Sequence, residues 1–141
     1  MQEETRVEWR EWGPEAFAAA RERDVPVLLS LSATWCRDCH EMDATTYADP
    51  GIAANLNDRY VPIRVDADRH PRIRERYAAG GFPSTVFLTP EGKLISGATA
   101  LGVDGMRQVL TRVAETYAEK GAEAGRVPRA LSGDLPPAGE V

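Results

Sequence analysis

The chain of 141 residues is poor in cysteine, in lysine and in long apolar runs. It has only two cysteines, which excludes a network of stapling disulfides, and a chain of this length buries a core without one. Its most apolar stretch, Val25–Ala33, is far shorter than a membrane-spanning helix of about 18 or more residues, so no transmembrane segment is expected. The net charge is −5, from 17 basic and 22 acidic residues in no long block, which argues against nucleic-acid binding.

The length suits one domain. The sequence predicts a domain over residues 1–124 and a tail or linker over residues 125–141, where Pro and Gly recur without apolar periodicity. The first residues, Met1–Arg6, are polar and have no apolar run behind them, which is not the pattern of a signal peptide. The cytoplasm is therefore the expected compartment.

Helical and strand patterns alternate along the domain. The strand patterns cover residues 26–32, 60–66, 85–88 and 93–96. The helical patterns cover residues 15–23, 36–47, 50–57 and 69–79, and a last helix capped by Asp104 carries the stripe Met106, Val109, Leu110, Val113 and Tyr117. Early alternation followed by a late hairpin predicts an α/β fold, with a mixed sheet covered by helices on both faces.

The two cysteines, Cys36 and Cys39, are separated by two residues where a buried strand gives way to a helix. Free backbone N–H groups and the dipole at the start of a helix favour an anion there, so we expect the pKa of Cys36 to fall below about 8.5. Cys39, one turn later, faces the same side and can close a small disulfide with Cys36. The pair supplies the attacking thiolate and the resolving thiol of dithiol–disulfide exchange.

Three other interpretations of this motif are open. A purely structural disulfide would close too small a loop to stabilise the fold much. A zinc site would have to combine Cys36 and Cys39 with His40 and His70, at a spacing that does not match a zinc ribbon or finger. Cys36-x-x-Cys39-His40 also matches the attachment signature of c-type haem, although helix–strand alternation is not the mostly helical wrap expected around that group. We predict no metal and no cofactor.

A second informative segment, Gly80–Leu88, contains Phe82-Pro83 directly before a strand. Together with Trp35-Cys36-x-x-Cys39 after a strand, and with a strand that ends at Asp66, this segment resembles the thioredoxin superfamily over most of the chain. The resemblance implies a thioredoxin-like fold with a cis-proline at Pro83. In that family the cis-proline keeps metals off the cysteines, and the backbone before it pairs with an extended substrate.

A closer resemblance is to the thioredoxin-like N-terminal domain of the spermatogenesis-associated protein family, largely of unknown function. Four segments carry it: Trp9–Phe17, Pro26–Ser32, Cys39–Met42 and Ile52–Asp66. Members of that family usually continue into a large helical domain related to sugar-processing enzymes.

Two positions depart from the thioredoxin pattern. The buried Asp that thioredoxins carry six residues before the first cysteine is Ser30 here, and their Lys four residues before the strand-ending Asp is Pro62. The usual buried proton acceptor for the second cysteine is therefore missing. Either Glu41, Asp43 or His40 is a candidate to replace it.

These observations predict a thiol–disulfide oxidoreductase that acts on protein or small disulfide substrates, with Cys36 and Cys39 as the catalytic residues. The substrate-binding residues implied by the resemblance and by the position of the indole are Trp35, Phe82 and Pro83. Arg37 would stabilise a thiolate on Cys36, Asp38 would oppose it, and His40 is either a modulator or a surface residue beside the site.

The expected partners are a disulfide-containing protein substrate or a reductase, with neither nucleic acid nor membrane. The alternative function is a redox-inert or redox-sensing thioredoxin-like binding module of a larger system. The missing proton acceptor motivates that alternative.

Overall fold

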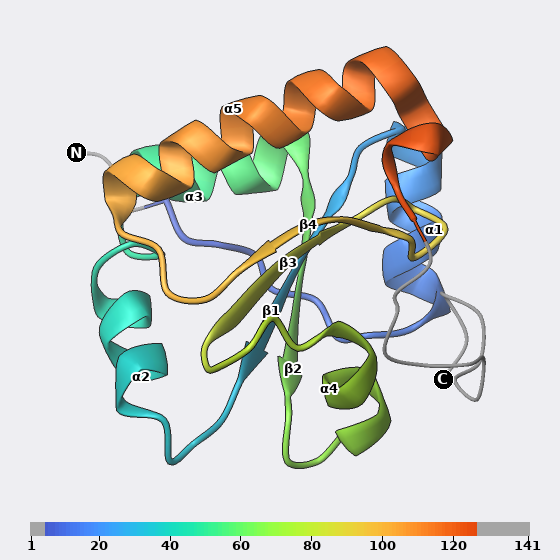
Figure 1. Cartoon of the computed structure of the whole chain (residues 1–141). Helices are drawn as coiled ribbons and strands as arrows, with labels where there is room; N and C mark the ends of the chain where they lie inside the picture. Colours follow the sequence, from blue (N-terminus) through green and yellow to red (C-terminus); the bar gives the residue numbers. More distant parts are fainter. Residues whose placement is uncertain (1–4, 127–141) are drawn as a thin grey trace.

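The computed structural model describes residues 5–126 and has a four-stranded sheet at its centre (Figure 1). Along the chain the elements are α1 (Pro14–Arg23), β1 (Val27–Ser32), α2 (Arg37–Ala44), α3 (Pro50–Arg59), β2 (Val61–Asp66), α4 (Pro71–Tyr77), β3 (Ser84–Leu88), β4 (Leu94–Ala98), α5 (Val103–Lys120) and a short 3-10 helix, η1 (Gly121–Ala124). The predicted order of helices and strands is confirmed. No helix in this part of the chain is both long and apolar enough to cross a membrane.

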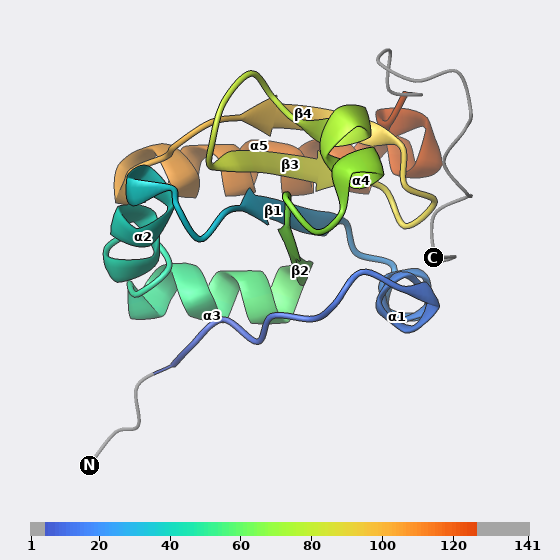
Figure 2. The same ribbon diagram turned by 90° about the horizontal axis from the view of Figure 1, so that it is seen from below.

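The strands lie in the order β2-β1-β3-β4, which Figure 2 shows from bottom to top. β1 is parallel to β2 and antiparallel to β3, and β3 forms an antiparallel hairpin with β4. The predicted mixed sheet is therefore confirmed. The carboxyl ends of the two parallel strands point to the same end of the sheet, where ligands bind in many α/β proteins.

Each face of the sheet is covered by its own helices. Val27, Leu29 and Leu31 of β1 pack in one cluster with residues of α1 and α4. Leu28, on the opposite face, packs with Phe87 and with residues of α2, α3 and α5. Because β1 is buried on both faces, it reads in the sequence as a nearly continuous apolar run rather than as an alternation.

The helix starts follow ordinary capping chemistry, with one difference from prediction. Pro14, Pro50 and Pro71 each lie in the first turn of a helix, where a missing N–H group costs nothing. Asp104 does not cap α5 as predicted: Gly102 occupies the N-cap position, and Asp104 lies in the first turn. An acidic residue is favourable in the first turn as well as at the cap, so the sequence pattern could not separate the two positions.

Both edges of the sheet are paired with segments outside the named strands. On the β2 edge, Arg10 donates to the carbonyl of Pro62 at 2.9 Å and accepts from the N–H group of Arg64 at 3.0 Å. On the β4 edge, Arg126 and Leu94 exchange two backbone hydrogen bonds of 2.7 and 2.9 Å. The first two residues of the predicted tail, Gly125 and Arg126, therefore lie against the sheet, and its residues 127–141 fall outside the described part.

Candidate active site around the Cys36–Cys39 disulfide

The two cysteines form a disulfide at the start of α2, with their Cα atoms 5.3 Å apart. Cys36 is the N-cap residue, and its sulfur accepts a hydrogen bond of 3.1 Å from the backbone N–H group of Cys39. Only 5% of Cys36 and 2% of Cys39 is exposed. The predicted juxtaposition of strand end, helix start and paired sulfurs is present, at the end of the sheet where β1 and β2 terminate (Figure 1).

Trp35, directly before the disulfide, is the large hydrophobic side chain that the described residues leave most exposed, at 62%. Its indole Nε1 donates a hydrogen bond of 2.7 Å to Oδ2 of Asp68, and its ring meets Phe82 edge to face at 5.8 Å. Asp66 is the last residue of β2 and Asp68 follows two residues later, where turn or capping residues are expected. The turn is present, since Asp66 Oδ1 accepts from the Asp68 N–H group at 3.0 Å, but no pattern pointed to the bond with Trp35.

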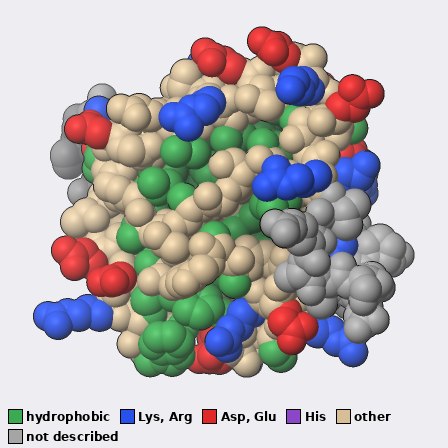
Figure 3. All heavy atoms as spheres, in the orientation of Figure 1, with side chains coloured by type: hydrophobic (Ala, Val, Ile, Leu, Met, Phe, Trp, Pro, Cys, Tyr) green, Lys and Arg blue, Asp and Glu red, His purple; other side chains and the backbone are tan. Residues whose placement is uncertain are grey.

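Phe82 lies beside the disulfide and is followed by Pro83. The peptide bond between them is cis, Pro83 is buried, and Phe82 packs against Cys36 and Cys39. The structure thus brings Trp35, Phe82 and Pro83 together around the cysteines, as their predicted substrate-binding role requires. In the space-filling view, hydrophobic side chains gather at this lower edge of the molecule (Figure 3).

The three predicted modulators occupy the first turns of α2. Arg37, Asp38 and His40 are all exposed. The His40 ring folds back so that Nε2 lies 2.8 Å from the carbonyl oxygen of Thr34. A carbonyl only accepts, so Nε2 is the donor in this bond and carries the proton.

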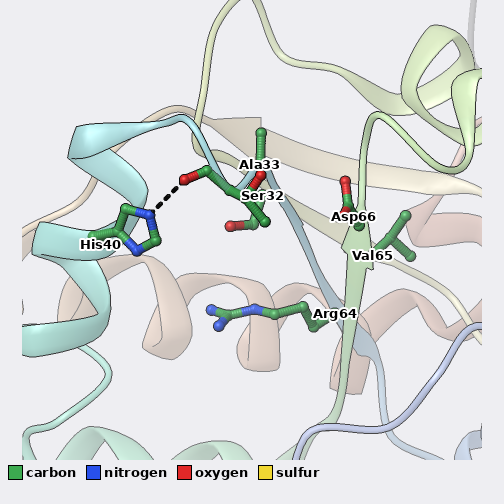
Figure 4. A pocket seen from close by; sticks show the side chains of 7 residues that line it. Ser32, Ala33, His40, Arg64, Val65 and Asp66 are labelled. Carbon is green, nitrogen blue, oxygen red and sulfur yellow. Dashed lines mark hydrogen bonds between the residues drawn. The ribbon is translucent and has the colours of Figure 1, made fainter.

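A pocket of about 170 Å³ lies behind the disulfide, between the start of α2 and the ends of β1 and β2 (Figure 4). It is lined by Ser32, Ala33, Thr34, His40, Arg64, Val65 and Asp66. Ala33 also packs against both cysteines, so one wall of the pocket is shared with the disulfide. The Nε atom of Arg64 is buried and has no hydrogen-bond partner in the described part of the chain. The pocket is large enough to hold a water molecule that could accept a hydrogen bond from this atom.

Arg64 corrects one sequence expectation. Ser30 pairs across the parallel strands with Arg64, whereas Pro62 pairs with Leu28. The residue beside Ser30 on the neighbouring strand is therefore the basic Arg64. The assignment of the thioredoxin lysine position to Pro62 was wrong. The register of the two parallel strands thus lies two residues from the position that counting back from Asp66 predicts.

A buried group of hydroxyls lies beneath the site, on the face covered by α2. Ser30 and Thr85 are neighbours across β1 and β3, and both are buried. Burial raises the pKa of Tyr47 to about 12, against smaller opposing contributions from Arg64, Ser30 and Thr85. The Tyr47 hydroxyl is thus neutral near pH 7, and it finds no hydrogen-bond partner within the described residues.

Within residues 5–126, no group of three or more His, Cys, Asp or Glu side chains is placed so that it could hold one metal ion. The polar side chains near the disulfide include His40, Arg64 and Asp66, which line the pocket, and Asp68, which bonds Trp35. Such a set can orient a thiol and solvate a proton.

The sheet order, the helices on both faces and the Cys-x-x-Cys disulfide at the start of α2 define a thioredoxin-like protein. The family described as "Protein of unknown function, DUF255", whose sequence model carries the name Thioredox_DsbH, matches residues 1–135. The chain belongs to this family.

The curated relatives agree with that placement. The chain is 35% identical to the uncharacterized protein B0495.5 of Caenorhabditis elegans over 112 residues, which are 74% of this chain and 15% of the relative. It is 30% identical to human spermatogenesis-associated protein 20 over 125 residues, which are 79% of this chain and 16% of the relative. The predicted resemblance is confirmed, and the chain spans about one sixth of the length of these two relatives.

Solved structures share the fold. A protein titled "DsbH Oxidoreductase" superposes with a TM-score of 0.69 at 17% identity, covering 78% of this chain and 85% of that one. A thioredoxin from Thermus thermophilus gives a TM-score of 0.62 at 24% identity, covering 82% and 92%. At these identities the likeness shows the fold, and the predicted thioredoxin-like fold class is confirmed.

Proposed function

We propose that the protein is a thiol–disulfide oxidoreductase whose reacting groups are Cys36 and Cys39. The observation that carries the proposal is the sulfur of Cys36 at the N-cap of α2, 3.1 Å from the N–H group of Cys39. In the reduced protein the same N–H group and the helix start favour a thiolate on Cys36 over the thiol. The thiolate is the form that attacks a disulfide.

The exchange balances as a transfer of two electrons. The Cys36 thiolate attacks one sulfur of the substrate disulfide, forms a mixed disulfide and expels the other sulfur as a thiolate. Cys39 then loses its proton and attacks the Cys36 sulfur, which forms the Cys36–Cys39 disulfide and releases the second substrate thiol. The substrate gains two electrons and two protons, and an external dithiol reductant has to return the protein to its reduced form.

Trp35, Phe82 and Pro83 support this proposal as the surface on which a substrate would lie. An exposed indole beside a nearly buried disulfide offers apolar contact area where a polypeptide can cover the sulfurs. The indole is held in place by Asp68 and Phe82, so little side-chain freedom is lost when a substrate packs on it.

The first test is the reduction potential of the pair, measured by equilibration in glutathione or dithiothreitol buffers followed by thiol trapping. A potential near about −270 mV would make the protein a reductant, and one between about −120 and −200 mV would make it an oxidant or isomerase and argue against a reductase in the cytoplasm. If the disulfide forms at no potential, the proposal fails.

Two substitutions test the roles of the sulfurs. Cys36→Ser should abolish the reduction of insulin, while Cys39→Ser should accumulate a mixed disulfide with the substrate that mass spectrometry detects. Full activity of the Cys36→Ser variant would overturn the mechanism.

The second candidate is a redox-inert or redox-sensing binding module. It is favoured by the burial of both sulfurs and by Ser30, which cannot take a proton as a carboxylate does. This function predicts cysteines that do not react with thiol reagents near neutral pH, or a turnover no better than that of free dithiothreitol.

A further inference from the structure

The charged side chains around the disulfide are distributed unevenly between two elements. On the α2 side, the exposed charged side chains of the first turns are Arg37, Asp38 and Glu41, which are one positive and two negative charges. On the α4 side, the segment from Asp68 to Arg76 contains four arginines against two carboxylates, in a chain whose net charge is −5. The α4 side of the site is thus basic, although the protein as a whole is acidic.

Arg74 adjoins the apolar contact surface formed by Trp35 and Phe82, and Arg69 is close to it in sequence. The Arg74 guanidinium lies 5.4 Å from the centre of the Phe82 ring, and 49% of the Arg74 side chain is exposed. Arg69 directly follows Asp68, the residue that holds the Trp35 indole, and is exposed. Figure 3 shows a basic side chain immediately beside the hydrophobic group at the lower edge of the molecule, on the side toward α4.

Asp68, the acidic neighbour of Arg74, does not occupy all of its N–H donors. Its Nη1 atom lies 4.0 Å from Oδ1 of Asp68, which is beyond hydrogen-bond distance, while Oδ2 of Asp68 accepts from Trp35. The guanidinium therefore keeps N–H donors that can bind a carboxylate in the planar, two-pronged manner that arginine favours.

We propose that Arg69 and Arg74 select substrates that carry acidic residues next to the reactive disulfide. This inference rests on the proposed function and names the substrate class of the same site. An acidic polypeptide segment lies across Trp35 and Phe82 with its carboxylates toward α4 and away from Asp38 and Glu41. Complementary rim charges of this kind raise the association rate and disfavour the wrong partner more than they raise the affinity.

Two model peptides test the proposal. Each has one cysteine joined by a disulfide to a chromophoric aryl thiol, flanked on both sides by glutamates in one peptide and by lysines in the other. Reduction by the dithiol form of the full chain releases the aryl thiol and the peptide thiol and leaves the Cys36–Cys39 disulfide. We expect kcat/KM to be about fivefold to tenfold higher for the Glu peptide at low ionic strength, and the ratio to approach one near 1 M salt.

Charge reversal supplies the matched comparison. The double variant Arg69→Glu/Arg74→Glu should reverse the preference in favour of the Lys peptide. Arg112 is an exposed arginine on α5, the helix that runs along the opposite side of the molecule from α4 (Figure 1), and Arg112→Glu should leave the preference unchanged. If the double variant does not fold, the salt dependence of the native chain decides the question alone.

The outcomes separate the two proposals. Equal rates for both peptides, or faster reduction of the Lys peptide by the native chain, would overturn the acidic-substrate proposal. The proposed function fails separately, if the reduced chain cannot reduce even an uncharged disulfide such as bis(2-hydroxyethyl) disulfide.

Discussion

Arg64 on β2 and Asp43 on α2 form a two-pronged ion pair, with Nη2 2.7 Å from Oδ1 and Nη1 3.1 Å from Oδ2. Asp43 lies one helical turn after Cys39, so the pair ties the helix that carries the disulfide to the sheet. The Trp9 ring covers the guanidinium at 4.2 Å. The N-terminal segment thereby helps to shield this ion pair from water. The Arg64 side chain remains 26% exposed and the Asp43 side chain 38% exposed.

The first prediction concerns this ion pair. Arg64→Met and Asp43→Asn should each lower the free energy of unfolding, and a double-mutant cycle should give a coupling of about 1 kcal/mol, because a partly exposed pair is partly screened. Urea denaturation measures it. The more exposed pair of Arg107 and Asp104, 3.8 Å apart, serves as the control and should show no measurable coupling. A coupling of Arg64 and Asp43 no larger than that of the control would contradict the prediction.

The second prediction concerns the exposed indole. Trp35→Ala should raise KM for a protein substrate roughly fivefold to tenfold, because a large aromatic contact is lost. Reduction of a small uncharged disulfide should change little, because such a substrate does not need the contact. Asp68→Asn retains an acceptor for the indole N–H group and should stay close to the native chain. Equal losses on large and small substrates after Trp35→Ala would count against a binding role.

The third prediction concerns alkaline stability. Burial raises the pKa of Tyr47 from 10.0 to about 12, so between these values the unfolded chain loses the proton that the folded chain keeps. The free energy of unfolding therefore falls across this window, by at most about 1.4 kcal/mol per pH unit from this residue. Below pH 10 the contribution of the neutral hydroxyl is fully present.

Tyr47→Phe should remove this share of the pH dependence, as measured by urea denaturation at pH 8 and pH 11.5. At pH 8 the substitution should be neutral or stabilising, because the hydroxyl is buried without a hydrogen-bond partner in residues 5–126. Burial also raises the pKa of Tyr60, Tyr77 and Tyr117, so a smaller slope should remain. An unchanged slope in the variant would refute the prediction.

The fourth prediction concerns Gly125. A Cβ atom there would lie 2.7 Å from Cβ of Lys93 and 2.7 Å from Cγ2 of Thr89. Gly125→Ala should therefore destabilise the fold by about 1–3 kcal/mol, in proportion to the displacement it forces. Gly102→Ala, where nothing lies within 4 Å of the added atom, is the matched control. Thermal unfolding of both variants measures the difference, and equal midpoints would show that the contact is unimportant.

The sequence predicted the parts of this molecule that depend on local pattern. The apolar run of β1, the prolines at three helix starts and the spacing of Cys36 and Cys39 each determine their structure within a few residues. The Trp35–Asp68 bond and the Arg64–Asp43 pair were not predictable in this way. Each joins residues on different elements, and a charged or aromatic side chain carries no periodicity that names its partner. The register of β1 against β2 decides which basic residue faces Ser30, and a single sequence does not specify that register.

The pairing of Arg10 with β2 and of Arg126 with β4 has a consequence for association between copies of the chain. An open outer strand presents unpaired backbone N–H and C=O groups on which a strand of another molecule can add. Here short segments from either end of the described chain cover part of each outer strand. We therefore expect a truncation that removes Arg10, or one that removes Arg126, to promote self-association of the chain.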